Sequence, residues 1–438
     1  MTTQDTLPLA ARPTDPMKHD NLLINFTMDF RRIWDTSGTN TTPAAFWRPT
    51  PAPDLLPGYF PLGDVIASGF DNINEIRMVP VVSEGESSNG QEPALQAPID
   101  FEQVWSDARP GATATRSIWR PIAPSGYVAL GQLCSNGQDK PLTSDIRCVR
   151  KDLAIRSFID DLIWNDKGSR ATQYFSAYNF YPPVAMPGEI NCLPGTFIGV
   201  GTHARPAAHI NAYSLRIPIP LEIKSPPQVP VLSDQQPMLF EPGKVTQIAK
   251  LPWFVVRDPN LTPLKQLRTS PFYFLERTDQ YVLVGYGKNE SAVSQTFRWT
   301  ARRPQRSGHL GVFARISSIV IHIQWPIGIP TLFSARLNKS FAHAESDGWA
   351  GPADVEVACI IGKNKAVAAY ELQSTYSLWR ENRTQVPCEL YYIDGNSLHL
   401  TEYPLEPASE GNPLSESETP ETVDNTASGD DMSIPPAS

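Results

Sequence analysis

The sequence predicts an all-β protein with two different β architectures in series, and three observations support this. The 438 residues include 43 Pro and 27 Gly, and proline removes a backbone donor and breaks helices. One sequence unit occurs three times in the first half, and a series of long apolar stretches follows it. Because no helical period of apolar residues persists in either half, strands and turns are expected throughout.

The repeated unit begins at an aliphatic-Trp pair, passes an acidic turn and reaches an aromatic-rich strand. Its copies are residues 29–65, 100–133 and 159–201. The first anchors are Trp34, Trp105 and Trp164, and the second anchors are Trp47, Trp119 and Tyr178. Each copy closes on Gly-Tyr-x-x-Leu-Gly, with Tyr59 and Tyr127, or on its degenerate form from Thr196 to Gly201. Such short strands cannot bury a core alone, so we predict a pseudo-threefold β-prism with inward anchors.

The chain divides by composition into five parts. They are a flexible N-terminus (1–20), the β-prism (21–216), a Pro-rich linker (217–244), an elongated module of long strands (245–403) and an acidic tail (404–438). The tail carries eight acidic residues and no Lys or Arg, so the net charge of -9 leaves about -1 for the rest. Few aromatics and a Ser/Glu/Thr/Pro composition predict that this tail is disordered.

Several function classes have no support in the sequence. The nearly neutral folded part has no basic face, which argues against nucleic acid as a partner. There is no His-Glu-x-x-His or Gly-x-Ser-x-Gly, and the glycine-spaced stretch Gly85–Glu92 lacks the lysine of a phosphate loop. We therefore expect no enzyme, no catalytic residues, no cofactor and no metal.

The N-terminal stretch and the cysteine spacing indicate the cellular compartment in which the protein is made. The N-terminal stretch has no apolar segment of the kind that signal peptides carry, and no stretch has 18 uninterrupted apolar residues. The five Cys lack Cys-x-x-Cys spacing, which is typical of reduced thiols. We expect cytoplasmic synthesis without a signal peptide, with release required for action on external membranes.

The motifs resemble a known family. Asp-Phe-x-x-Val/Ile-Trp, Trp-Arg-Pro and Gly-Tyr-x-x-Leu-Gly together resemble the vacuolar protein sorting-associated protein 62 family over about residues 21–205. The second half is similar to the elongated modules of aerolysin and epsilon-toxin-type pore-forming proteins. The resemblance implies an aerolysin-like long-stranded domain, although insertion hairpins of that type are Ser/Thr-rich, whereas here the stretch is aliphatic and contains Pro326 and Pro330.

Residues 311–344 form the candidate membrane segment, because they read as two strands joined by Pro-Ile-Gly-Ile-Pro. A transmembrane β-strand needs about 9–11 residues, which each arm supplies. The insertion candidates are Ile319, Ile321, Ile323, Trp325, Ile327 and Ile329. A strand buried on both faces, followed by a proline-bounded loop, explains the same pattern, and this alternative stays open.

An aspartate follows each first anchor, and these residues are the candidates for ligand binding: Asp35, Asp107 and Asp166. A short carboxylate there either fixes the turn by accepting backbone hydrogen bonds or holds two sugar hydroxyls beside an aromatic ring. Ligand specificity is expected where the copies differ, in the loops Ala52–Pro57, Ser83–Ala97 and Pro182–Leu193.

These features favour a membrane-acting, pore-forming-toxin-like function. The prism would recognise a surface glycan or lipid, and the long strands would form a homo-oligomer on the membrane. The alternatives are a non-lytic adaptor for proteins or lipids in vesicle trafficking, and an enzyme of unknown chemistry.

Overall fold

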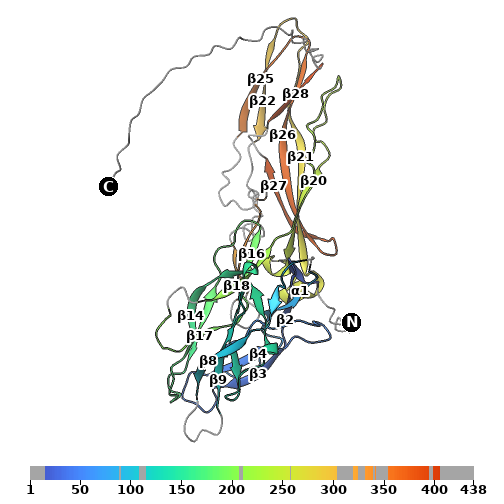
Figure 1. The fold of residues 1–438 in the computed structure, drawn as a ribbon. Helices are drawn as coiled ribbons and strands as arrows, with labels where there is room; N and C mark the ends of the chain where they lie inside the picture. The colour runs from blue at the N-terminus through green and yellow to red at the C-terminus, as the bar shows by residue number, and fades with distance from the viewer. Residues whose placement is uncertain are drawn as a thin grey trace, which may run out of the picture.

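The computed structural model describes residues 15–87, 90–107, 115–206, 211–256, 258–302, 319–323, 331–338, 341, 354–393 and 398–404. Figure 1 shows an elongated molecule with a module of short strands at one end and a module of long strands at the other. The predicted all-β class, with a pseudo-threefold prism followed by an elongated domain, is confirmed. Across these ranges the one α-helix is α1 (Pro263–Thr269), and no helix is long and apolar enough to cross a membrane.

Each sequence repeat forms one three-stranded antiparallel sheet. The sheets are β3 (Phe30–Asp35), β4 (Ala44–Pro49) and β5 (Val65–Ser68); β8 (Asp100–Ser106), β9 (Ser117–Ile122) and β11 (Leu133–Ser135); and β14 (Phe158–Asn165), β15 (Ser176–Tyr181) and β17 (Ile198–Val200). A register shift stands directly before the first Trp in all three sheets. The common bulge indicates one structural unit used three times, because a bulge re-aims the side chain that follows it.

The three first anchors meet at the pseudo-threefold axis. Ring centroids are 6.2 Å apart for Trp34 and Trp105, 6.2 Å for Trp34 and Trp164, and 5.9 Å for Trp105 and Trp164. All three side chains are buried in one cluster with residues from every repeat. This aromatic centre is the core of the prism.

The second anchors lie away from the axis, which corrects the expectation that every anchor points inward. They belong to three separate peripheral clusters around Trp47, Trp119 and Tyr178. The strand pleat explains this, because successive residues face opposite sides of a sheet. Phe46 lies in the central cluster, so Trp47 must face outward.

The closing motif of the third repeat also differs from its expected position. A Cβ on Gly63 would lie 2.8 Å from Gly131 Cα and 2.9 Å from Thr196 Cγ2. The third residue at this contact is therefore Thr196, whereas the sequence motif placed Gly201 there. The register agrees, because Val65, Leu133 and Ile198 lie opposite the three second anchors.

A second set of three sheets completes the prism. They are built from β1 (Met17–His19), β2 (Leu22–Thr27) and β6 (Val79–Glu84); β7 (Leu95–Gln96), β10 (Tyr127–Val128) and β12 (Cys148–Arg150); and β13 (Ala154–Arg156), β16 (Glu189–Cys192) and β18 (Tyr213–Pro218). The last sheet also contains β23 (Ile319–Ile323) and β24 (Thr331–Arg336). Residues expected in the elongated module thus extend a sheet of the prism.

The elongated module is a sheet of long strands. Its members are β19 (Leu221–Ile223), β20 (Lys244–Pro252), β21 (Phe272–Lys288), β26 (Ala366–Arg380), β27 (Gln385–Ile393) and β28 (His399–Tyr403), with β22 (Gln295–Arg302) and β25 (Asp354–Ile361) as a separate pair. One hydrophobic cluster joins Ile24 of the prism to Trp253 and Tyr376 of this module. The Phe26 ring contacts the rings of Trp253 and Phe254 at 5.7 and 5.4 Å. The two modules therefore share a core.

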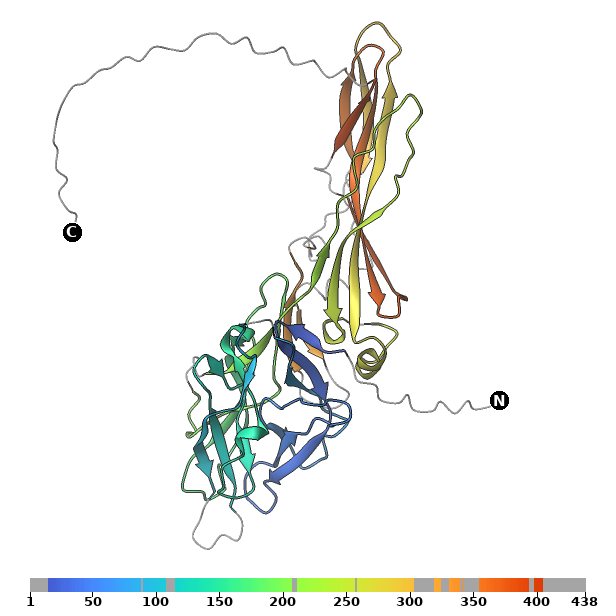
Figure 2. The ribbon, with the colours of Figure 1, turned by 45° about the vertical axis from the view of Figure 1, so that its right-hand side comes forward.

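The Pro-rich segment 217–244 lies along the long sheet and is not a free spacer. It contributes β19, and further on Glu241 N donates to Tyr281 O at 3.1 Å while Leu283 N donates to Leu239 O at 2.9 Å. Leu232 is buried among tyrosines of the sheet. Proline lacks the N–H of a regular ladder, so the segment pairs intermittently along β21. Figure 2 shows this course beside the upper module. Residues 1–14 and 405–438, which include most of the acidic tail, lie outside the described ranges.

Candidate functional site

Strands β22 and β25 form an amphipathic hairpin that pairs with no other described strand. Their register runs from Gln295 opposite Ile361 to Arg302 opposite Asp354. Phe297, Trp299 and Ala301 are buried or half-buried, and the intervening residues Thr296, Arg298 and Thr300 are exposed. This two-residue period is visible in the sequence. The insertion candidates named from the sequence, Ile319 to Ile329, nevertheless lie outside this hairpin. The hairpin lies on the long sheet, against β21 (Figure 1).

Two glycines in β21 let the apolar face of this hairpin approach the backbone. A Cβ on Gly285 would lie 2.1 Å from Trp299 Cγ, and one on Gly287 would lie 2.7 Å from Phe297 Cδ1. Residues two apart in a strand share a face, so the pair forms one shallow groove, the glycine furrow. Glycine inside a strand often marks such a close approach. The furrow fixes where the two aromatic rings dock.

The chain between β22 and β25 leaves the long sheet and reaches the prism. Its strand β24 pairs with β16 from Glu189 opposite Arg336 to Cys192 opposite Phe333. Ala185 N donates to Ser334 Oγ at 2.8 Å. The following residues Leu337 and Phe341 are buried in the core that both modules share. We call this docking of β24 on β16 the latch.

The predicted insertion residues are only partly placed. Ile319, Ile321 and Ile323 belong to β23, which pairs with β24 at the edge of the prism sheet. Trp325, Ile327 and Ile329 lie outside the described residues. Both Ser334 and Ala335 of β24 are buried although they face opposite sides. β24 is therefore covered on both faces, whereas the burial of the β23 side chains lies outside what the structure describes, so both interpretations of that strand remain predictions.

The aspartates after the first anchors make hydrogen bonds within the protein. Asp107 Oδ1 accepts from Arg116 N at 2.6 Å, and Asp166 Oδ1 accepts from Phe175 N at 3.0 Å. In the first repeat Thr36 Oγ1 accepts from Ala44 N at 2.9 Å in the same way. Asp35 stands one residue earlier, so the equivalent position belongs to Thr36. At this position the side chain closes the turn.

Asp166 has the most partners of the three. Its Oδ2 accepts from Trp105 Nε1 at 3.0 Å, and His203 Nε2 lies 2.5 Å from Oδ1. The residue is buried beside the axial tryptophans. A carboxylate held in this way positions the side chains around the axis. Asp35 bonds to Ser37 N and to the Arg32 guanidinium.

Three of the cysteines that the structure describes are buried. Burial raises the pKa of the Cys192 thiol well above its usual range, so it stays protonated beside the latch. Cys134 and Cys148 are also buried, and burial raises the pKa of each thiol. Within the described ranges no group of three or more His, Cys, Asp or Glu could hold a metal ion.

The resemblance drawn from the repeat motifs can now be compared with known proteins. The sequence model of the vacuolar protein sorting-associated protein 62 family matches residues 16–225. That resemblance is confirmed. The match covers the prism and stops at the start of the Pro-rich segment. No curated protein matches this chain.

Two solved structures show partial similarity. GNIP1Aa from Chromobacterium piscinae is 22% identical with a TM-score of 0.37, over 45% of this chain and 37% of that one. Cry35Ab1 is 9% identical with a TM-score of 0.30, over 71% of this chain and 89% of that one. This chain therefore matches little more than a third of GNIP1Aa. Both TM-scores are low, and neither similarity establishes a function.

Proposed function

We propose that this protein acts on membranes as a pore-forming-toxin-like protein. Its prism recognises a surface glycan or lipid, and its long-stranded module oligomerises and inserts a hairpin. The observation that carries the proposal is the path of the chain between β22 and β25. This segment interrupts a paired hairpin: the hairpin itself rests on the glycine furrow, and the segment docks on the prism at the latch.

The hairpin has the alternation that a membrane-crossing β-strand requires. Its apolar face, with Phe297 and Trp299, rests on the furrow and would turn to lipid on release, while Thr296, Arg298 and Thr300 would face water. Each strand has eight residues, close to the ~9–11 residues that cross a bilayer. A hairpin in lipid must pair both edges, so neighbouring copies would close a barrel.

Release of residues 303–353 would keep the repeated sheets and the long ladder paired, and it would take Leu337 and Phe341 out of the core that both modules share. The three repeated sheets and the pairing of β21 with β26 use none of residues 303–353. The prism would keep its axial tryptophans and the long sheet would keep its ladder. The protein thus has a rigid body and a segment attached through separable contacts, which suits a change from a water-soluble to a membrane-bound state.

A disulfide across the latch tests the proposal. Cys192 lies opposite position 333, and directly paired antiparallel residues have Cα atoms about 4.5–5.5 Å apart, within the range of a disulfide. In Phe333→Cys, catalysed oxidation should join the two thiols, as mass spectrometry would show. We expect dye leakage from liposomes and from glycan-bearing cell-derived vesicles to fall to background, and a reductant to restore it.

The double variant Cys192→Ser/Phe333→Cys is the matched control, because it carries the same new thiol and cannot form the bond. It should leak equally with and without oxidant. Leakage by the cross-linked protein at the unlinked rate would contradict release of the latch. Absence of leakage by the wild-type protein on every vesicle would remove the pore proposal and favour the non-lytic adaptor.

A further inference from the structure

The prism contains three equivalent glycine turns whose surroundings can be compared. They span Leu56–Tyr59, Pro124–Tyr127 and Met186–Glu189, and in each the last N–H donates to the first carbonyl, at 3.3, 3.1 and 3.0 Å. The third residue is a glycine with a left-handed φ of 73, 82 and 84° at Gly58, Gly126 and Gly188. This geometry is that of a type II turn.

Two of the three turns are covered by the protein and one is open. A Cβ on Gly58 would lie 3.6 Å from Ser83 Oγ, and one on Gly188 would lie 3.6 Å from Asn338 Nδ2. A Cβ on Gly126 would meet no atom within 4 Å. Comparison of the three repeats therefore shows that the second turn lacks the side chain that covers the glycine in the other two.

The residue that lies opposite the glycine of each turn is also held by the protein in two repeats and exposed in the second. Lys151 N donates to Gly126 O at 2.9 Å, and Ile219 N donates to Gly188 O at 2.8 Å. Ile219 is buried, and Glu84 at the corresponding place in the first repeat accepts from Asn21, Ala94 and Leu95. Lys151 is exposed, and its ammonium has no hydrogen-bond or ion-pair partner within the part of the chain that the structure describes.

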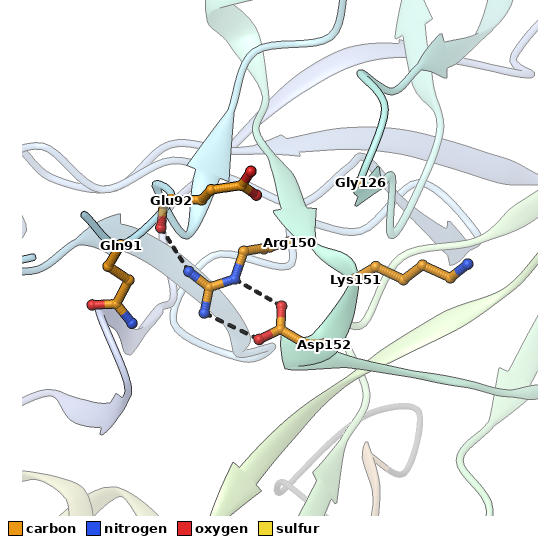
Figure 3. A pocket seen from close by; sticks show the side chains of 6 residues that line it. All are labelled: Gln91, Glu92, Gly126, Arg150, Lys151 and Asp152. Atoms are coloured by element: carbon orange, nitrogen blue, oxygen red, sulfur yellow. Dashed lines mark hydrogen bonds and ion pairs between the residues drawn. The ribbon is translucent and has the colours of Figure 1, made fainter.

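Beside Gly126 lies an open depression of ≈ 630 Å³, which we call the Gly126 pocket. It is lined by Gln91, Glu92, Gly126, Arg150, Lys151 and Asp152. Figure 3 shows the Arg150 guanidinium turned onto Asp152 and the Glu92 carbonyl. Asp152 and Asp20 raise the pKa of Arg150, so its charge is fixed and neutralised within the protein. The depression is shallow and open to solvent, so it suits one residue of a surface-bound ligand and not a fully enclosed small molecule.

The two groups left for a ligand are the Glu92 carboxylate and the Lys151 ammonium. They carry opposite charges, and over the whole site Arg150 and Lys151 face three carboxylates, a balance of about -1. A strongly anionic ligand is therefore disfavoured. The lining holds no aromatic ring to surround a quaternary ammonium. Neutral hydroxyl groups, which both donate and accept, fit this pair of side chains.

We propose that the Gly126 pocket binds a sugar residue of a neutral glycan. Glu92 accepts hydrogen bonds from its hydroxyls, Lys151 donates to them, and the ion pairs of Arg150 hold the two walls in place. Gln91 and Glu92 come from Ser83–Ala97, one of the loops in which the copies differ. The inference rests on the recognition step of the proposed function and names its ligand class and its residues.

Binding of the full-length protein to an array of neutral, sialylated and sulfated glycans tests this. We expect the wild-type protein to bind at least one neutral glycan. For that glycan, Glu92→Gln and Lys151→Ala should each raise Kd at least tenfold with unchanged melting temperature. The matched controls are Glu86→Gln in the same loop and Lys167→Ala in an exposed turn of the third repeat, and both should bind as the wild type does.

Three outcomes would overturn the proposal: binding to no glycan, binding to charged glycans alone, or unchanged affinity in both pocket variants. Leakage from glycan-free vesicles at high protein concentration tests the pore proposal independently of glycan binding. If the pocket variants lose glycan binding and still leak, both proposals stand. If the wild-type protein binds glycans and never leaks, only the pore proposal fails.

Discussion

The indole ring of Trp299 lies against the backbone of Gly285, where a Cβ would be 2.1 Å from the ring carbon Cγ. Phe297 and Gly287 repeat the relationship two residues away on each strand. Glycine in a strand interior costs roughly 0.5–1 kcal/mol relative to alanine. Here that cost is offset by docking two aromatic side chains of the hairpin. The furrow is thus the place where the hairpin docks on the long sheet.

Gly285→Ala should weaken this docking, because the new methyl group must displace the Trp299 ring. Overpacking of this kind costs about 1–3 kcal/mol. We expect a lower melting temperature and faster leakage from liposomes, since the hairpin leaves its seat more easily. Gly362→Ala is the control, because a Cβ there would lie 3.5 Å from Lys365 Cδ, an ordinary contact. Unchanged melting and leakage in Gly285→Ala would show that the furrow does not hold the hairpin.

The axial tryptophans should differ in what their indole N–H groups contribute. Trp105 Nε1 donates to Asp166 and Trp164 Nε1 donates to Thr42 O, at 3.0 and 3.1 Å, whereas Trp34 Nε1 has no partner among the described residues. Replacement by Phe should therefore cost about 1 kcal/mol more at Trp105 and Trp164 than at Trp34. Urea unfolding of the three variants measures this. Equal losses would mean that ring volume alone sets their cost.

The repeats made the prism predictable, because three tryptophans at one spacing need a common centre. At two positions, the sequence did not show which residues of the three repeats correspond to one another in the structure. The first repeat uses Thr36 where the others use aspartate, since a hydroxyl and a carboxylate both accept the turn's hydrogen bond. In the third, Thr196 takes the axial place of a glycine. In both cases the backbone of the repeat keeps its path, and a different side chain occupies the same position.

The latch was beyond sequence reasoning for a different reason. Residue 192 pairs with residue 333, and nothing local to either strand specifies so distant a partner. An aliphatic strand suits lipid and a doubly covered sheet equally well. The alternation from Thr296 to Ala301 was readable as a half-buried strand. What it packs on depends on two glycines of another strand, which only the fold brings beneath it.

The Pro-rich segment offers a test that uses two neighbouring residues. Leu232 is 3% exposed among tyrosines of the long sheet, and Val231 is 79% exposed. Leu232→Ala should cost about 2–5 kcal/mol, the usual range for a buried leucine, and Val231→Ala should cost close to nothing. Urea denaturation measures both. Equal and small effects would mean that the segment is a spacer, as its composition alone suggested.

The ion pair of Asp258 with Arg380 should make stability depend on pH. Arg380 Nε and a terminal nitrogen donate to the carboxylate at 2.6 and 2.9 Å, and Tyr273 donates at 3.1 Å. Burial works to raise the pKa of Asp258, but the hydrogen bonds from Arg380 outweigh it and hold the pKa below its usual 3.8. The folded state therefore binds the proton less readily than the unfolded state does.

This contribution is complete above the unfolded pKa of about 3.9 and is lost as pH falls through the lower folded value. Asp258→Asn leaves the Arg380 charge without its partner and should cost about 3–5 kcal/mol at pH 7. The gap between variant and wild type should narrow below about pH 4, where Asp258 itself becomes protonated. Unfolding free energies in urea from pH 7 to acid measure this. The control is Asp54→Asn, an exposed carboxylate in a loop of the first repeat, and its unfolding free energy should change with pH as that of the wild type does. A gap that stays constant with pH would show that the pair does not carry the dependence.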